Sequence, residues 1–255
     1  MTATDGTRVE FVPERGRLRL SLDAFEALVA GPGGDPAADA ALEVAGVLAD
    51  GVPHPAVEAL TAPARSARCV VEVSVAGARG TTGHRVYVAP EAATALLHVD
   101  DGVVQVVADR PDGVPALLAR VVRLGPRPRL ADDGAPEAVA VGVAATDAAG
   151  LTLPDRSSVA AAADRLAAAA PWSAYGDALR AGTWRLWTAR ATWPGPDDEP
   201  GGRAVTVLDT PAGLTEVHGL DAPEPGPVRL APATPSTVWL ALVRLLPADD
   251  ELPGA

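Results

Sequence analysis

The chain has 255 residues, of which 48% are hydrophobic, and its formal net charge at pH 7 is −12. It contains no lysine, and its arginines are scattered along the sequence. Nucleic-acid binding depends on clustered Lys and Arg, so this composition argues against a nucleic-acid partner. The chain has no apolar run of about 18 residues, and its first residues lack the pattern of a secretory signal. We therefore expect a cytoplasmic protein that does not insert into a membrane.

The chain has a single cysteine, Cys69. One cysteine excludes an intramolecular disulfide framework and a zinc site built from cysteines. It lies in the apolar run CVVEVSV, which predicts a small buried hydrophobic side chain rather than a reactive thiol.

The first half of the chain predicts helices followed by a four-stranded meander. Ser21 or Asp23 can cap a helix that Gly31 and Pro32 end. Further on, β-branched residues alternate with polar ones, which is typical of strands, and the Asp-Gly pair at 101–102 predicts a tight hairpin. The expected order is a strand at 17–22, helices at 23–31, 37–50 and 56–60, strands at 67–77, 84–90, 93–99 and 102–109, and a helix at 113–124.

The second half predicts the same order of elements. Its Pro- and Gly-rich breaks fall between short alternating runs and two apolar helical stretches. The expected elements are a strand at 138–144, helices at 157–170 and 175–179, strands at 184–193, 203–209, 212–219 and 227–232, and a helix at 238–247.

The two halves therefore predict an internal repeat. Leu60 and Leu179, His98 and His218, and Arg123 and Arg244 are each separated by about 120 residues, a nearly constant offset. We expect one α+β domain over residues 1–255, with pseudo-two-fold halves at 14–126 and 138–247 and a crossover linker at 127–137. Each half offers an antiparallel four-stranded meander with flanking helices, and the two sheets can also pair across the pseudo-two-fold axis.

The residue types that carry catalysis form no recognisable pattern. None of the four histidines lies in a metal-binding spacing, although His98 and His218 occupy equivalent positions of the repeat. The alternative that His98 and His218 share a metal ion is less expected than the alternative that both are ordinary histidines on strands. LDTPAG, residues 208–213, resembles an aspartic-protease loop only faintly, because the equivalent stretch of the first half has no second Asp-Thr pair. We expect no cofactor, no metal and no catalytic residue.

Tryptophan is the most conspicuous residue type. All five tryptophans lie in the second half: Trp172, Trp184, Trp187, Trp193 and Trp239. Tryptophans are either core residues or interface anchors. We expect Trp239 to be core, and we leave both alternatives open for the strand that carries Trp184, Trp187 and Trp193.

Two loops join expected strands at equivalent places in the repeat. GARGTTG, residues 77–83, is glycine-rich but lacks the Lys of a phosphate loop and does not open a helix. PGPDDEPGG, residues 194–202, carries acidic residues, which we expect to be exposed to solvent. The candidate partner-binding residues are the three strand tryptophans and four loop residues. The loop residues are Arg79 and Thr81 in the first loop and Asp197 and Asp198 in the second.

The order of motifs resembles a known family. VTVLDTPAGLTEVHG followed by VRLAPATPSTVWLALVRLLP is similar to the C-terminal signature of the EspG family of actinobacterial type VII (ESX) secretion systems. In the first half, LDAFEALVAG, EVSVAG, the Asp-Gly hairpin and its closing helix resemble the same family, so the likeness covers nearly the whole chain. The resemblance implies an EspG-like pseudo-two-fold fold.

It also implies a function. EspG proteins are cytosolic chaperones that hold secretion substrates soluble before export, so we expect a secreted helical partner, PPE-like or WXG100-like, and no enzyme activity. Because this chain has short hairpin loops and no lysine, a substrate other than a PPE protein is also open. Two alternatives remain: a scaffold protein of the secretion locus, and an enzyme whose polar residues converge only in three dimensions.

Overall fold

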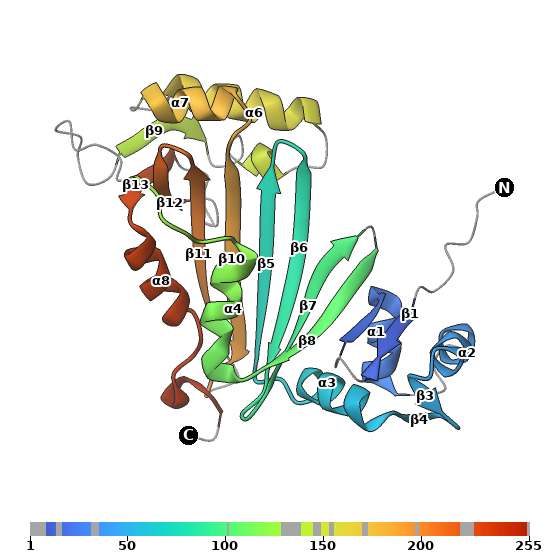
Figure 1. The fold of residues 1–255 in the computed structure, drawn as a ribbon. Coiled ribbons are helices and arrows are strands. Elements are labelled where there is room, and N and C mark those ends of the chain that lie inside the picture. The colour runs from blue at the N-terminus through green and yellow to red at the C-terminus, as the bar shows by residue number, and fades with distance from the viewer. Residues whose placement is uncertain are drawn as a thin grey trace.

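The described strands form an 11-stranded antiparallel sheet and a two-stranded hairpin (Figure 1). The structure is a computed structural model, and it describes residues 9–13, 17–31, 36–100, 102–128, 139–144, 149–152, 156–169, 173–196, 199–219 and 227–253. The strands are β1 (Val9–Val12), β2 (Arg17–Ser21), β3 (Leu48–Ala49), β4 (Val52–Pro53), β5 (Cys69–Gly77), β6 (Gly80–Val88), β7 (Ala93–Asp100), β8 (Val103–Asp109), β9 (Val139–Ala144), β10 (Arg185–Pro194), β11 (Pro200–Thr210), β12 (Gly213–His218) and β13 (Pro227–Ala233).

Helices flank the sheet, so the expected α+β class is confirmed. They are α1 (Leu22–Ala30), α2 (Pro36–Val44), α3 (Pro55–Arg65), α4 (Val114–Val121), α6 (Arg156–Ala169), α7 (Ser173–Arg180) and α8 (Pro235–Val243), with 3-10 turns at Pro111–Gly113, Ala149–Thr152 and Asp249–Glu251.

Local sequence signals account for the first helix. The hydroxyl of Ser21 accepts a hydrogen bond from the backbone N–H of Ala24 at 3.3 Å, and Gly31 ends α1 with a φ of +94°, as its sequence predicts. The next expected helix, 37–50, is wrong in its second part. There α2 ends at Val44, Gly46 adopts a φ of +70°, and the chain turns into the β3–β4 hairpin.

Both meanders are present. The strand order of the sheet is β1-β2-β8-β7-β6-β5-β10-β11-β12-β13-β9, so β5 to β8 and β10 to β13 are each adjacent in chain order. The two meanders do not form separate sheets, because β5 pairs with β10 along most of their length, with Val73 opposite Ala189. Beyond the meanders, β2 and β1 extend one end of the sheet and β9 extends the other.

Helices α4 and α8 cover one face of the joined sheet (Figure 1). Side chains of a strand point alternately to the two faces, and the residues of β5 and β10 that face these helices are apolar. They include Val71, Val73, Trp187 and Ala189, which are at most 2% exposed. The helices contribute Leu118, Val238 and others to this core.

Two helical layers cover the opposite face, one over each half of the sheet. Next to Trp187 on β10, Leu186 points to this second face and packs with α6 and α7. At the other end, α1, α2 and α3 pack on β2, β7 and β8 around Phe25 and Leu96. Between the two layers, Glu72 and Arg190 face outward from the middle of the sheet and are exposed.

Candidate protein-binding surface

The tryptophans on β10 and just before it do not form an exposed surface. Trp184, Trp187 and Trp193 are 4%, 1% and 6% exposed, so the hypothesis that they anchor a partner from the surface is wrong for this conformation. Trp184 belongs to the core under α6 and α7, whereas the other two face α4 and α8. The solvent side of β10 is instead formed by Arg190, Thr192 and Pro194, which are exposed. Trp172 lies outside the described residues.

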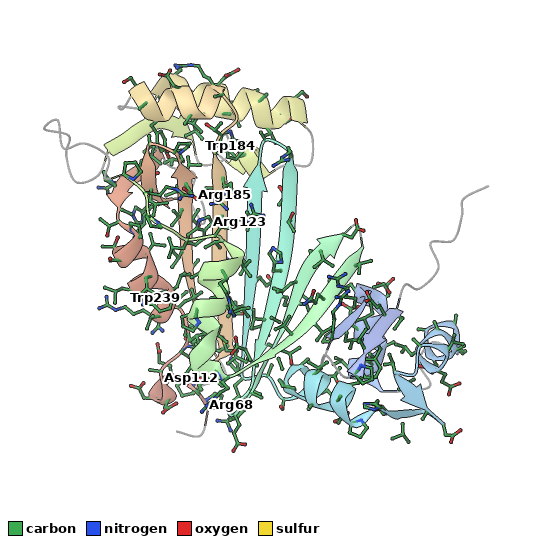
Figure 2. The ribbon with its side chains drawn as sticks, viewed as in Figure 1. Arg68, Asp112, Arg123, Trp184, Arg185 and Trp239 are labelled. Carbon is green, nitrogen blue, oxygen red and sulfur yellow. The ribbon has the colours of Figure 1, made fainter. Side chains whose placement is uncertain are left out.

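Among the tryptophans that the structure describes, the exposed one is Trp239, which the sequence predicts to be core. Its exposure is 39%, and its neighbours on α8, Leu240 and Val243, are 49% and 45% exposed. Figure 2 shows Trp239 on the outer layer formed by α8. The inward side of α8 is formed by Val238 and Leu242, which are fully buried. We call Trp239, Leu240 and Val243 the α8 strip.

Caps at both ends hold α8 in place. The Thr234 hydroxyl accepts from the backbone N–H of Thr237 at 3.2 Å, and the Thr237 hydroxyl accepts from the backbone N–H of Thr234 at 2.9 Å. At the other end, Arg203 donates to the carbonyl oxygens of Arg244 and Leu246 at 3.0 and 2.7 Å. These bonds satisfy backbone groups that a helix end leaves without partners, so the strip is presented on a fixed helix.

Arg203 also connects α8 to the sheet. Its guanidinium lies 5.3 Å from the ring centroid of Trp193, a cation–π geometry, and it forms an ion pair with Glu251 at 2.7 Å. The pKa of Glu251 is held below its usual range, first by the hydrogen bond that its carboxylate accepts from the Ala248 N–H and then by Arg203. Trp193 therefore supports the surface of α8 from beneath rather than contacting a partner itself.

The two candidate loops differ in what the structure describes. Arg79 and Thr81 are exposed at the β5–β6 hairpin, and the Thr81 hydroxyl donates to the carbonyl oxygen of Thr152 at 3.2 Å. The hairpin tip is thus in contact with the turn before α6. Asp197 and Asp198 lie outside the described residues.

His98 and His218 do not come together. Strands β6, β5, β10 and β11 separate β7 from β12, and with neighbouring strands about 4.8 Å apart these two strands are roughly 24 Å apart across the sheet. His98 is instead next to His84, whose Nδ1 accepts the backbone N–H of His98 at 3.2 Å. Burial, and then the nearby charge of His98, lower the pKa of His84. Among the described residues, no three His, Cys, Asp or Glu side chains are grouped to hold a metal.

Cys69 is a buried residue, as the sequence predicts. It is 3% exposed at the start of β5, and burial raises the pKa of its thiol to about 11. A thiol that stays protonated at neutral pH is a poor nucleophile and a poor metal ligand.

A groove lies on the second face of the sheet, between the two helical layers. Its volume is about 340 Å³, and its floor is polar: Glu72, Ser74, Arg85, Thr188 and Arg190. Glu72 is paired with Arg85 at 2.9 Å. The wall toward α1 is apolar and is formed by Leu22, Leu96 and Val104. Among the described lining residues, Glu72 is the one carboxylate, and its pairing with Arg85 makes it a poor general base; His84 and His98 also line the groove.

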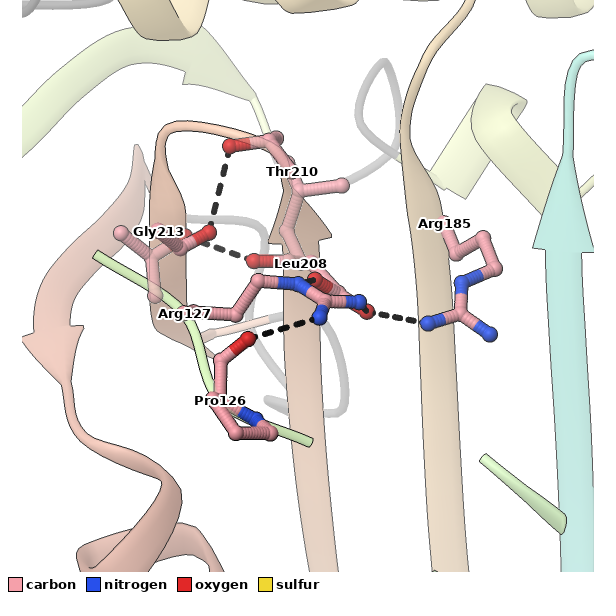
Figure 3. A network of polar contacts seen from close by, with 8 residues as sticks. Pro126, Arg127, Arg185, Leu208, Thr210 and Gly213 are labelled. Atoms are coloured by element: carbon pink, nitrogen blue, oxygen red, sulfur yellow. Dashed lines mark hydrogen bonds and ion pairs between the residues drawn. The ribbon is translucent and has the colours of Figure 1, made fainter. Parts of the chain in front are cut away.

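A buried acid anchors the segment that follows α4. Asp209 on β11 is 4% exposed, and Arg127 and Arg185 both bind its carboxylate. Figure 3 shows Arg127, from the segment that follows α4, and Arg185, from β10, extending toward each other. The Arg127 guanidinium also donates to the carbonyl oxygen of Pro126 at 3.0 Å. Sequence analysis missed this cluster, because its three members come from distant segments.

In the part of the chain that the structure describes, no helix has the length and apolar character needed to cross a membrane. Comparison with known protein families finds no matching family model, and comparison with curated proteins finds no match.

Proposed function

We propose that this chain is an EspG-like cytosolic binding protein that holds a type VII (ESX) secretion substrate soluble before export, by stoichiometric binding and not by catalysis. The observation that carries the proposal is the α8 strip. Three large apolar side chains, one of them a tryptophan, are exposed together on a helix that is capped at both ends. Contiguous exposed apolar groups on a fixed element are typical of a protein-binding surface, and tryptophan is the residue type most enriched among binding hot spots.

The partner that fits this surface is an apolar helical segment. The α8 strip is itself helical, and helices associate by packing apolar ridges against each other. A secreted helical protein, PPE-like or WXG100-like, would supply such a segment. Without a chaperone, its exposed apolar tip would favour aggregation in the cytosol.

Strand order supports the EspG-like repeat within this proposal. Outward from the β5–β10 pair, the order is β5-β6-β7-β8 on one side and β10-β11-β12-β13 on the other. Each meander is followed by a helix, α4 or α8, and these two helices cover the same face of the sheet. A pseudo-two-fold axis between β5 and β10 accounts for this arrangement.

The test is affinity purification of the tagged protein from the cytosol of its own organism, followed by mass spectrometry of proteins that elute near equal stoichiometry. We expect a small helical protein that is also found in the culture medium. The double variant Trp239→Ser, Leu240→Ser should lose this protein. Val44→Ser is the matched control, because Val44 is 92% exposed on α2, away from the strip. Elution of the wild-type protein alone, or equal recovery of the partner by both variants, would contradict the proposal.

A further inference from the structure

A second cavity lies at the tip of the β5–β6 hairpin and shares no residue with the α8 strip. Its volume is about 440 Å³. The hairpin tip, the end of α4 and the start of β10 with the turn before it form its walls, and three arginines line it, one from each segment: Arg79, Arg123 and Arg185. Figure 2 shows Arg123 and Arg185 in the same part of the molecule. We call this the arginine cavity.

The charge of the arginine cavity is opposite to that of the protein. The chain carries a net charge of −12, yet the described residues that line this cavity include three arginines and no Asp or Glu. Like charges gathered in one cavity repel each other and are stable only with solvent or a counter-ion between them. A positive cavity on an acidic protein therefore favours anions locally.

Two of these guanidinium groups are available to a ligand. In the described part of the chain, neither Arg79 nor Arg123 forms an ion pair, and both are exposed. The third, Arg185, is bound to Asp209 through one of its terminal nitrogens. Because Arg127 also binds Asp209, one carboxylate is shared between two arginines and does not cancel their charge.

The walls of the cavity are fixed by the fold. Asp209 holds Arg185 at the start of β10, and Arg123 follows the end of α4 with a φ of +53°. Gly182, in the turn before β10, has a φ of +68°, and a Cβ at this position would lie 3.2 Å from the Cβ of Ala78 in the hairpin tip. The glycine thus allows the turn and the hairpin to approach closely, which brings their arginines to one cavity.

We propose that the arginine cavity binds a small molecule that carries two or more negative charges on phosphate or carboxylate groups. Guanidinium groups present paired N–H donors that match the oxygens of both groups, and such charge-assisted bonds are stronger than neutral ones. The cavity has the size of ordinary small-molecule sites. This inference goes beyond the binding of a secretion substrate and does not depend on it.

Isothermal titration calorimetry of the purified full chain tests the proposal, with pyrophosphate and citrate as separate probes. The two probes distinguish a phosphate ligand from a carboxylate ligand. The variants are Arg79→Gln, at the exposed hairpin tip, and Arg123→Asn, because asparagine tolerates a positive φ better than most residues. The matched control is Arg68→Gln: Arg68 is also exposed but precedes β5, at the opposite end of that strand from the hairpin tip (Figure 2).

We expect at least one probe to bind the wild-type protein, and each cavity variant to weaken that binding by at least about tenfold, because each removes charge-assisted hydrogen bonds. Arg68→Gln should bind as the wild type does. No binding of either probe to the wild-type protein, or equal weakening by Arg68→Gln, would overturn the proposal. Thermal melts of each variant confirm that it is folded, and if Arg123→Asn is unfolded, Arg79→Gln alone decides.

Discussion

Arg127 donates two hydrogen bonds to Asp209, from Nε to Oδ1 at 2.7 Å and from Nη2 to Oδ2 at 3.0 Å, across 82 residues of sequence. The bond fastens the segment that leaves α4 onto β11, where the carboxylate is buried. Arg185 binds the same carboxylate from β10. One acid thus ties together three segments that meet only in the folded chain.

Replacing this acid should destabilise the protein. Asp209→Asn leaves two half-buried guanidinium groups without their anion, so we expect the free energy of unfolding to fall by about 2 to 3 kcal/mol at pH 7. Urea unfolding followed by circular dichroism measures this change. Asp177→Asn is the control, since its ion pair with Arg180 is exposed and should contribute less than about 0.5 kcal/mol. Equal stability of the two variants would contradict the structural role of Asp209.

Arg203 should control the last turn of α8. Arg203→Ala removes the donors to the carbonyl oxygens of Arg244 and Leu246. We expect amide hydrogen exchange in residues 240–246 to become roughly tenfold faster, while exchange in the central strands stays unchanged. Arg203→Lys keeps the charge but not the forked donors, and should give an intermediate rate. Unchanged exchange in Arg203→Ala would show that packing alone holds this turn.

The layer formed by α6 and α7 contains a buried hydrogen bond between side chains. The hydroxyls of Tyr175 and Thr215 are 2.6 Å apart, and the Thr215 hydroxyl also donates to the carbonyl oxygen of Leu208 at 3.3 Å. Thr215 has one hydroxyl proton, so Tyr175 is the donor in the first bond. Burial raises the pKa of Tyr175 well above its usual range, so the phenol keeps its proton at any ordinary pH.

Tyr175→Phe should lower the free energy of unfolding by about 1 kcal/mol, because the buried hydroxyl of Thr215 no longer accepts a hydrogen bond from Tyr175. A double-mutant cycle with Thr215→Val isolates the bond from the packing of the ring. We expect a coupling energy of about 1 kcal/mol. A coupling near zero would mean that the two hydroxyls contribute independently.

His84 should make stability depend on pH. Burial and the charge of His98 lower the pKa of His84 below its ordinary value of 6.5, so the unfolded chain binds a proton before the folded one does. Stability is therefore lost as the pH falls below 6.5, with a slope of at most about 1.4 kcal/mol per pH unit from this group. Protonation of Nδ1 would also break its bond to the His98 N–H.

His84→Asn removes this titration and keeps an oxygen near the position of Nδ1. Urea unfolding of both proteins between pH 8 and pH 5 should give similar stabilities at the upper end and a shallower decline for the variant below 6.5. If the stability of the two proteins declined in parallel, groups other than His84 would be responsible for the loss of stability at low pH.

Local signals in the sequence are enough to predict most elements. The cap at Ser21, the glycine after α1 and the alternation in β5 act over a few residues, and each is realised in the structure. The two meanders follow from short hairpins for the same reason. The end of α2 also has a local signal, which the sequence analysis missed: Gly46 adopts a positive φ, and the backbone N–H groups of Gly46 and Val47 donate to the carbonyl oxygens of Glu43 and Leu42, the bonds of a glycine C-cap.

The exposed surface was harder to predict. Trp187 and Trp193 lie on the face of β10 that α4 and α8 cover, and Trp184, just before β10, packs under α6 and α7. Alternation in the sequence cannot distinguish an apolar face that the chain's own helices cover from one that a partner covers. A signal for α8 was present: Trp239, Leu240 and Val243 are apolar on the side opposite Val238 and Leu242, so one side of this short helix has to face solvent or a partner. The arginine cavity could not be predicted, because its three arginines converge only through the pairing of β5 with β10.

That central pairing also sets how the chain can fold. Val73 and Ala189 meet across more than a hundred residues, so much of the sheet consists of contacts with a high sequence separation, which is a feature of slow folding. Either half alone would leave β5 or β10 as a long unpaired edge, open to addition of another strand. The halves are therefore not independent domains, and a nascent chain that ends before β10 carries an aggregation-prone edge until translation supplies its partner.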